Sequence, residues 1–482
     1  MWKEYISATS ITEVLQVLAE RGSQARVVAG ATDLILEMER GQRKGIETLI
    51  DVTRIAGLNQ IAYDESGVIH LGPLVTHNHC VASKLICDHA LPLARACWEV
   101  GSPQIRNRGT IAGNLITASP ANDTITPLVA LNAAVTLRSL KDGQSSERVV
   151  PLKEFYTGVR RTLLQPDEML VDIAFPAMQM NQRGTFVKFA LRQAQAISLV
   201  NAAVVLTFGD GGSSQDILQD ARITLGAVAP TIIHAEEAEE FLRGKALNEE
   251  TIRGTAELAV RAARPINDVR GSAGYRRRIT KVVVQRSLHA IAAHQEYAGL
   301  PESPVLLAGK NNGSTPLFVK PIHHTDEDPI ITRINGKEYV IPGGQHKTLL
   351  RLLRENAGLV GSKEGCAEGE CGACTVFLDG AAVMSCMVPA PRAHGAEIVT
   401  VEGLATNGRL HPVQEAYVEE GAVQCGYCTP GFLMSAAKLL EERDHPSGDE
   451  IRQALTGNLC RCTGYYKIIQ AIELAAEKGV TS

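Results

Sequence analysis

The chain has 482 residues, 45% of them hydrophobic and 21% charged, and its formal net charge is -5. Because a single hydrophobic core stops growing well below this length, we expect about three to five domains. The weakly acidic balance offers no basic excess for a polyanion, which argues against a nucleic-acid partner. The sequence has no secretory apolar segment and no run of about 18 apolar residues, which predicts a cytoplasmic protein without a membrane span.

Helix and strand signals alternate in the first third of the chain, with helical periodicity at 11–20 and 125–131 and an extended run at 27–29. From about residue 184 the order changes, and three strand-like runs precede three helix-like runs. The strands are expected at 185–189, 203–208 and 221–227, and the helices at 233–243, 249–262 and 274–294. These patterns predict two mixed domains, 1–176 and 177–296.

A proline-rich segment at 297–328 interrupts any periodic pattern, which predicts a linker. It contains the polar run 311–314 and the histidines His323 and His324, which we expect to be solvated. Beyond it, Asn335-Gly336 lies between two strand-like runs, 331–334 and 338–341, and favours a type I′ hairpin turn. Helices are expected at 348–355, 411–420, 430–442, 449–455 and 465–478. Two further domains, 329–402 and 403–482, are therefore predicted.

Eight of the eleven cysteines fall in these last two domains, as two sets of four. The first set has the spacing C-x4-C-x2-C-x11-C, which is plant-type [2Fe-2S] spacing. Its members are Cys366, Cys371, Cys374 and Cys386. Three glycines among the first three cysteines let the backbone wrap closely and point N–H groups at sulfur. A structural zinc ion usually takes two C-x2-C pairs, so this set favours iron.

The second set pairs a C-x2-C with a distant C-x-C, a spacing that by itself also suits zinc. Its members are Cys425, Cys428, Cys460 and Cys462. Each pair lies just before an expected helix, so two helix N-termini would face one anionic cluster. The neighbouring plant-type set favours a second [2Fe-2S] cluster here. The other cysteines, Cys80, Cys87 and Cys97, are expected to be small buried hydrophobic residues.

Two glycine-containing loops in the N-terminal region suit a bulky phosphorylated cofactor. The first, 27–34, follows a strand and precedes a helix, so its backbone N–H groups could hold a pyrophosphate, although such a turn is more often a helix cap. The second, 106–115, continues into 119–123 and consists largely of small residues. His77, His79 and Cys80 could suggest a metal, but a helix start after Thr76 explains them better.

The strings 365–374, 424–431 and 457–465 closely resemble the iron–sulfur subunit of the xanthine dehydrogenase family of molybdenum hydroxylases. The two glycine loops, together with 271–277, resemble the FAD-binding subunit of that family. The arginine run 276–278 begins inside this last segment, and we expect it to be a solvated face or a source of structural ion pairs.

The resemblance implies a multidomain α+β protein. The expected folds are a vanillyl-alcohol-oxidase-type FAD-binding domain at 1–176, an α+β flavoprotein C-terminal domain at 177–296, a plant-ferredoxin-like β-grasp domain at 329–402 and an all-α [2Fe-2S] helical-bundle domain at 403–482.

The same resemblance assigns the site residues. FAD would contact Val28, Ala29, Gly30, Ala31, Thr32, Asp33, Leu34, Gly109, Thr110, Ala112, Gly113, Asn114, Ser119, Asp123, Leu170 and Lys188. Gln424 would touch the pterin of a partner subunit. Ala31 and Ala112 stand where many relatives carry glycine, so the loop geometry is expected to differ there. No residue is assigned a catalytic role, because the thiolates are ligands and not nucleophiles.

The function implied by the resemblance is an electron relay. A large molybdopterin-binding subunit would hydroxylate a substrate, and electrons would pass through the helical-domain cluster, the plant-type cluster and FAD to NAD or another acceptor. The chain leaves no room for molybdenum domains, so we expect a separate subunit and a dimer of complete modules. Xanthine is the leading substrate, and nicotinate, aldehydes and carbon monoxide are alternatives. Two other hypotheses are a standalone NADH-dependent diaphorase and a zinc-stabilised scaffold.

Overall fold

A computed structural model describes residues 2–209, 217–309 and 316–479. The chain forms two compact units, each built from separate stretches of sequence. The first unit comprises Met1–Ala56, Gly101–Gly109 and Pro304–Ser482, and the second comprises Gly57–Val100 and Thr110–Ser303. None of the described helices is long and apolar enough to cross a membrane.

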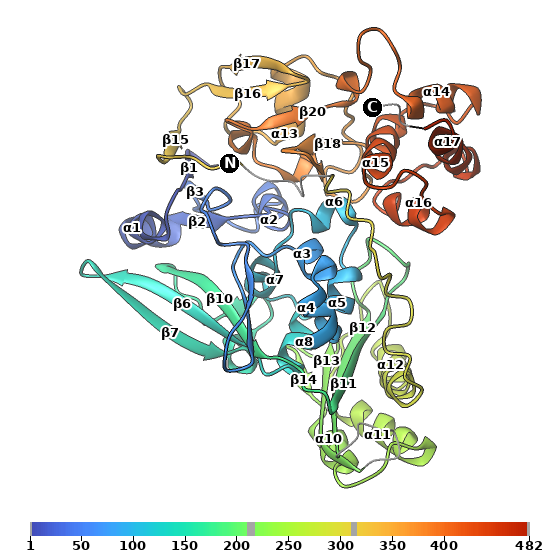
Figure 1. Ribbon diagram of the computed structural model, residues 1–482. Helices are drawn as coiled ribbons and strands as arrows, with labels where there is room; N and C mark the ends of the chain where they lie inside the picture. The colour runs from blue at the N-terminus through green and yellow to red at the C-terminus, as the bar shows by residue number, and fades with distance from the viewer. Residues whose placement is uncertain (1, 210–216, 310–315, 480–482) are drawn as a thin grey trace. The chain divides into compact units, whose positions relative to one another are not determined.

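The first unit begins with a small sheet that has a parallel centre (Figure 1). Its strand order is β15-β1-β3-β2, with β1 at Glu4–Ser7, β2 at Ala25–Val28, β3 at Thr48–Asp51 and β15 at Ile322–His324. Helix α1 (Ile11–Arg21) and the 3-10 turn η1 (Gly22–Gln24) connect β1 to β2, and α2 (Leu34–Glu39) follows β2. Ser10 caps α1 by accepting the N–H of Glu13, which confirms the expected helix start.

A five-stranded sheet in the same unit has the order β17-β16-β20-β18-β19. The strands are β16 (Ile330–Ile334), β17 (Lys337–Ile341), β18 (Thr375–Leu378), β19 (Ala381–Met384) and β20 (Glu397–Val399). Asn335 and Gly336 have φ angles of 51° and 76°, so the predicted type I′ turn is confirmed. Five short helical segments connect or follow these strands: α13 (Leu349–Arg351), the π-helical η2 (Leu352–Asn356), η3 (Ser385–Met387), η4 (Ala390–Ala393) and η5 (Val401–Gly403).

Four helices follow the sheet and share one apolar core, drawn in orange and red in Figure 1. They are α14 (Pro412–Glu419), α15 (Thr429–Glu442), α16 (Gly448–Ala454) and α17 (Tyr466–Glu477). Every one of them lies within two residues of its predicted limits. Pro430 occupies the first turn of α15, where its missing N–H costs nothing. The predicted all-α domain is confirmed.

Much of the predicted linker is packed within the first unit. Leu307 accepts a hydrogen bond from the N–H of Ala382 at 2.8 Å, and the Glu442 carboxylate accepts the N–H groups of Ala308 and Gly309. Farther on, β15 pairs antiparallel with β1. The run 311–314 lies outside the described residues.

The expectation that both linker histidines are solvated is wrong for one of them. The side chain of His323 is 52% exposed, whereas His324 is 1% exposed and its ring centroid lies 4.7 Å from that of His394, with the two rings tilted by 58°. The sequence pattern missed this because the segment forms a strand, β15, that pairs with β1, and the residue opposite His324 in that pairing is Tyr5, more than 300 positions earlier in the chain.

The second unit contains a five-stranded antiparallel sheet of order β4-β5-β10-β6-β7. Its strands are β4 (Ile61–Tyr63), β5 (Val68–Leu71), β6 (Ala134–Lys141), β7 (Gln144–Pro151) and β10 (Glu168–Pro176), and a two-stranded ribbon, β8 (Tyr156–Gly158) and β9 (Arg161–Thr162), follows β7. Helices share its core: α3 (His77–Ala82), α4 (Lys84–His89), α5 (Leu91–Trp98), α7 (Ile111–Thr117), α8 (Ile125–Ala130) and α9 (Leu152–Phe155). Thr76 and His79 form a capping box, which confirms the helix start predicted there.

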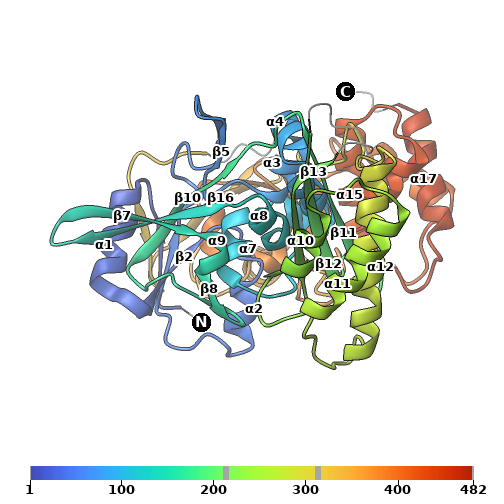
Figure 2. The same cartoon turned by 90° about the horizontal axis from the view of Figure 1, so that it is seen from below.

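A second antiparallel sheet in this unit has the order β11-β12-β13-β14. Its strands are β11 (Gln182–Phe189), β12 (Val200–Phe208), β13 (Leu218–Gly226) and β14 (Ile233–His234). It packs against α10 (Glu236–Leu242), α11 (Glu249–Ala262) and α12 (Ala273–Ala292), and α12 runs beside β11 and β12 (Figure 2). The helix predicted from residue 233 begins only at Glu236, because 233–234 instead pair with β13.

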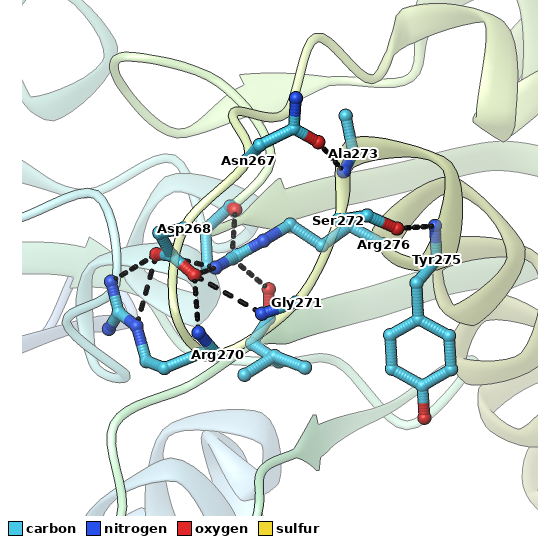
Figure 3. Close-up of polar contacts among 10 residues, drawn as sticks. Asn267, Asp268, Arg270, Gly271, Ser272, Ala273, Tyr275 and Arg276 are labelled. Carbon is cyan, nitrogen blue, oxygen red and sulfur yellow. Dashed lines mark hydrogen bonds and ion pairs between the residues drawn. The ribbon is translucent and has the colours of Figure 1, made fainter.

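The start of α12 rests on a buried ion pair (Figure 3). Asp268 accepts hydrogen bonds from Arg270 and Arg276, and Arg276 is only 2% exposed. Ser272 caps the helix by accepting the N–H of Tyr275. Arg276 is therefore a structural ion-pair residue, one of the two roles expected for the arginine run. Together the two units confirm the multidomain α+β architecture.

Candidate cofactor sites

The loop that carries the first three cysteines turns its backbone toward sulfur. Cys366 Sγ accepts the N–H groups of Glu368, Glu370 and Cys371 at 3.3, 3.3 and 3.4 Å. Gly369 and Gly372 have positive φ angles of 74° and 70°, a backbone conformation that residues with a side chain rarely adopt. Hydrogen bonds from the Cys371 thiol and these amides lower the pKa of Cys366 to about 5. The loop is therefore preorganised to hold an anionic sulfur.

The four thiols of this set lie as two pairs. Cys374 Sγ and Cys386 Sγ are 3.4 Å apart and both residues are buried. Cys366 and Cys371 form the other pair: the backbone N–H of Cys366 donates to Cys371 Sγ, and the backbone N–H of Cys371 donates to Cys366 Sγ.

The helical-domain thiols are also paired. Cys425 Sγ and Cys462 Sγ lie 3.5 Å apart, and Cys428 faces Cys460. The Thr463 hydroxyl donates to Cys460 Sγ at 3.1 Å. Cys425 and Cys462 are exposed, while Cys428 and Cys460 are half-buried. Each pair joins the segment before α15 to the segment before α17.

This two-by-two arrangement bears on which metal the thiols fit. A zinc ion takes four ligands at one centre, whereas each iron of a [2Fe-2S] cluster takes two. Both cysteine sets therefore fit a binuclear iron cluster.

A direct backbone contact joins the two cysteine-bearing loops. The N–H of Leu459, next to Cys460, donates to the carbonyl oxygen of Cys371 at 3.0 Å. At Gly431, the first turn of α15 comes so close to this loop that an added Cβ would lie 2.1 Å from the Gly372 oxygen. The two thiol sets are thus linked through one hydrogen bond and a few covalent bonds.

Buried amides hold this contact in place. Gln104 Nε2 donates to Ser435 Oγ and to Asn458 Oδ1 at 2.9 and 3.1 Å, and Ser435 donates to Asn458 at 2.8 Å. All three side chains are at most 3% exposed. Gln104 comes from α6 (Pro103–Arg106), so a segment of the flavin region fixes the loop that carries Cys460. Sequence reasoning missed this group because no local pattern marks Gln104 or Asn458.

The first predicted flavin loop offers free backbone donors. The N–H groups of Gly30, Ala31 and Thr32 have no hydrogen-bond partner in the part of the chain that the structure describes. Gly30 packs against the backbone of Arg108, where a Cβ would lie 2.2 Å from the Arg108 oxygen, and Arg108 donates to the carbonyl of Ala29. This loop fits an anionic group such as a pyrophosphate.

The same loop shares a hydrophobic core with the plant-type thiols. Val28 and Ala31 belong to the cluster of buried residues that includes Cys374 and Cys386. Ala31 has a φ angle of 64°, the conformation that glycine adopts most readily. Asp33 starts α2 and is exposed, and Leu34 packs against this core. The first flavin loop and the plant-type site are therefore parts of one packed structure.

The second predicted flavin loop opens α7 in the second unit. Thr110 is the N-cap and accepts the N–H of Gly113 at 2.9 Å. Ala112 is buried in the first turn, and Gly113 is exposed. Asn114 Oδ1 accepts the Thr124 hydroxyl, and Ser119 accepts the N–H of Ala121. Gly109, the residue before Thr110, belongs to the first unit and donates its N–H to Ile105.

Asp123 and Lys188 are paired with each other. Lys188 Nζ lies 2.7 Å from Asp123 Oδ2 and also donates to the Glu99 carbonyl at 2.9 Å. Asp123 accepts further hydrogen bonds from Ser198 and Asn201. The pair is at least nine-tenths buried, so both groups are fixed. Leu170, also predicted, is a buried residue of β10 at a bulge.

Gln424 is exposed beside Cys425 in the helical domain. We call the exposed part of this domain around Cys425 and Cys462 its open edge. Several large apolar side chains are exposed in the same sequence segments, on either side of the thiols. They are Val418, Val423, Tyr427, Leu459 and Tyr466.

Four family models match consecutive parts of the chain. They are an FAD binding domain in molybdopterin dehydrogenase at 2–178, a CO dehydrogenase flavoprotein C-terminal domain at 185–291, a 2Fe-2S iron-sulfur cluster binding domain at 332–398 and a [2Fe-2S] binding domain at 400–473. The chain therefore carries an FAD-binding domain and two [2Fe-2S] domains.

Known proteins match the two halves separately. The nicotinate dehydrogenase small FeS subunit of Eubacterium barkeri is 48% identical over 145 residues, 30% of this chain and 92% of that protein. The xanthine dehydrogenase iron-sulfur-binding subunit of Escherichia coli O157:H7 is 47% identical over 153 residues, 31% and 96% respectively. A chain of Hydrogenophaga pseudoflava carbon monoxide dehydrogenase is 31% identical with a TM-score of 0.56, covering 61% of this chain and 98% of its own.

The chain belongs to the xanthine dehydrogenase family of molybdenum hydroxylases and joins in one polypeptide the FAD and iron–sulfur parts of such enzymes. It is an electron-transfer subunit of an oxidoreductase of this family.

Proposed function

We propose that this chain relays electrons from a partner molybdopterin subunit through its two clusters to FAD and then to NAD. When bound, the clusters carry single electrons and FAD exchanges both single electrons and hydride. One observation carries the proposal: the thiol sets form a series within the first unit. It runs from exposed Cys425 and Cys462, across the Leu459 to Cys371 hydrogen bond, to buried Cys374 and Cys386 beside the flavin loop.

The eight paired cysteines are the proposed ligands. In the plant-type site, Cys366 with Cys371 and Cys374 with Cys386 would each hold one iron. In the helical site, Cys425 with Cys462 and Cys428 with Cys460 would do the same. Amide N–H groups on Cys366 and the Thr463 hydroxyl on Cys460 stabilise the negative sulfur.

For FAD, the free N–H groups of Gly30, Ala31 and Thr32 are the proposed phosphate donors. Thr110, Ala112, Gly113, Asn114 and Ser119 are the proposed second contact region. Lys188 and Asp123 act as a fixed polar pair near the flavin, and Leu170 supplies apolar packing. The proposed domain limits remain 1–176, 177–296, 329–402 and 403–482, with a linker at 297–328.

The partner subunit is proposed to dock at the open edge of the helical domain. Exposed thiols would leave a bound cluster open to solvent, and the exposed apolar residues Val423, Leu459 and Tyr466 flank them. A partner that covers this edge would bury those side chains and bring its pterin to Gln424. Assembly as a dimer of such complexes is proposed from the family resemblance.

The substrate is proposed to be a purine such as xanthine, and an N-heterocycle such as nicotinate is the second candidate. Both choices follow relatives of the cluster half, a xanthine dehydrogenase subunit and a nicotinate dehydrogenase subunit of nearly equal identity. Carbon monoxide is a third candidate through the flavin half.

Native purification tests the proposal. We expect a molybdopterin-containing partner to co-purify, and visible absorption to bleach when xanthine, nicotinate, an aldehyde or carbon monoxide is added anaerobically. The standalone diaphorase predicts NADH-driven bleaching without any partner. A zinc scaffold predicts a colourless protein. Either result would contradict the relay.

A further inference from the structure

Tyr417 on α14 has a buried hydroxyl that the fold leaves without a partner. The residue is 3% exposed, and its Oη makes no hydrogen bond to any residue that the structure describes. A buried hydroxyl without a partner costs free energy, because it has given up its hydrogen bonds to water. An acceptor at this position would remove that cost.

The core around Tyr417 also contacts two of the proposed sulfur ligands. Tyr417 packs in the core of the helical domain with Phe432 and Ile468, and the side chains of Cys428 and Cys460 pack against the same core. Burial, and then negative charge on those two sulfurs, raise the pKa of Tyr417. Tyr417 and the inner pair of thiols thus belong to one packed core.

The hydrogen bonds that the structure describes around the inner pair of thiols supply donors to Cys460 but not to Cys428. Thr463 already donates its hydroxyl and its N–H to Cys460 Sγ, whereas the Tyr465 hydroxyl accepts the Cys460 N–H. No described side chain donates in this way to Cys428. In the part of this core that the structure describes, Tyr417 offers a buried O–H that has no acceptor.

We propose that the Tyr417 hydroxyl donates a hydrogen bond to the helical-domain cluster, at Cys428 Sγ or a bridging sulfide, and raises the reduction potential of that cluster. The inference rests on the ligand set proposed above. A donor to sulfur stabilises the reduced state more, because the reduced cluster is the more negative one. Tyr417 is thus a positioning residue that sets how readily this cluster accepts an electron.

The test is a redox titration of Tyr417→Phe in the full chain, followed by electron paramagnetic resonance. The plant-type cluster serves as an internal reference in every sample. We expect the equilibrium constant for reduction of the helical-domain cluster to fall about tenfold, equivalent to about 59 mV for one electron, while the reference is unchanged. Tyr63→Phe, on an exposed tyrosine that takes no part in the proposed cofactor or partner sites, is the control and should change neither equilibrium constant.

A second substitution guards against a folding defect. Placing 3-fluorotyrosine at position 417 keeps the shape but makes the hydroxyl a stronger donor, so the constant should rise. If both variants contain four irons per chain and the equilibrium constant for reduction of the helical-domain cluster is unchanged in both, the proposed role of Tyr417 is overturned. Failure of the ligand proposal looks different, because wild-type protein would then lack the helical-domain signal altogether.

Discussion

Leu459 donates its backbone N–H to the carbonyl oxygen of Cys371 at 3.0 Å, and this hydrogen bond connects the two cysteine-bearing loops. Cys371 is a proposed ligand of the plant-type cluster, and Cys460 follows Leu459 directly. The buried amides of Gln104 and Asn458 hold the contact in place. Two domains that the sequence presents as separate cluster modules are thus joined by a direct backbone hydrogen bond.

Two alanine-to-glycine substitutions should have opposite effects. Ala31 has a positive φ angle, which costs a side chain about 1 to 2 kcal/mol, so Ala31→Gly should stabilise the protein and tighten FAD binding. Ala112 lies buried in the first turn of α7, so Ala112→Gly should destabilise by about 1 to 2 kcal/mol. Thermal unfolding and FAD titration of apoprotein measure both. Shifts of the same sign would refute this account of the two loops.

The close approach at Gly431 predicts a strong effect of a single methyl group. In Gly431→Ala the new Cβ would meet the Gly372 oxygen at 2.1 Å and force α15 away from the plant-type loop. We expect iron per chain to fall and electron transfer between clusters to slow. Gly448→Ala, in the first turn of α16, meets only the Arg452 side chain at 3.4 Å and serves as the control. Full iron loading of Gly431→Ala with unchanged kinetics would contradict the proposed contact.

Breaking the Lys188–Asp123 pair should be costly. Lys188→Met leaves the Asp123 carboxylate buried without its cation, and such a loss typically costs about 3 to 5 kcal/mol. Calorimetry and retained FAD per chain report the effect. Lys281→Met removes a solvent-exposed pair with Glu257 and should leave both readouts unchanged. Equal behaviour of the two variants would show that the buried pair has no special role.

Acid sensitivity should depend on His324. Burial, with further contributions from His394 and Arg54, lowers the pKa of His324 to about 4. As pH falls, the His324 side chain is protonated in the unfolded chain before it is protonated in the folded chain. The free energy of unfolding therefore decreases by roughly 2 to 3 kcal/mol as pH falls from 6.5 toward 4. His324→Phe should flatten the profile between pH 6.5 and 4, while His445→Phe in an exposed loop should not. Identical acid profiles for wild type and His324→Phe would contradict the assignment.

Local signals account for what the sequence predicted well. The turn at Asn335-Gly336, the cap at Thr76 and the four C-terminal helices depend on neighbouring residues, and the structure confirms them. The cysteine spacing predicted two sets of four thiols, but it did not predict which thiols pair within each set, because in the helical domain each pair joins two distant segments. Contacts distant in sequence were not predictable: the partner strand that buries His324 is one example, and Leu459 with Cys371 is another. The pairing of β14 with β13 likewise overrode a helical pattern.

The central claim is that the FAD and both clusters of this one chain exchange electrons internally. Flash photoreduction of the bound FAD, followed by visible absorption and freeze-quench electron paramagnetic resonance, tests it most directly. The account predicts that both iron–sulfur signals appear with a first-order rate that is independent of protein concentration. A rate proportional to concentration, or reduced FAD with both iron signals absent, would contradict it.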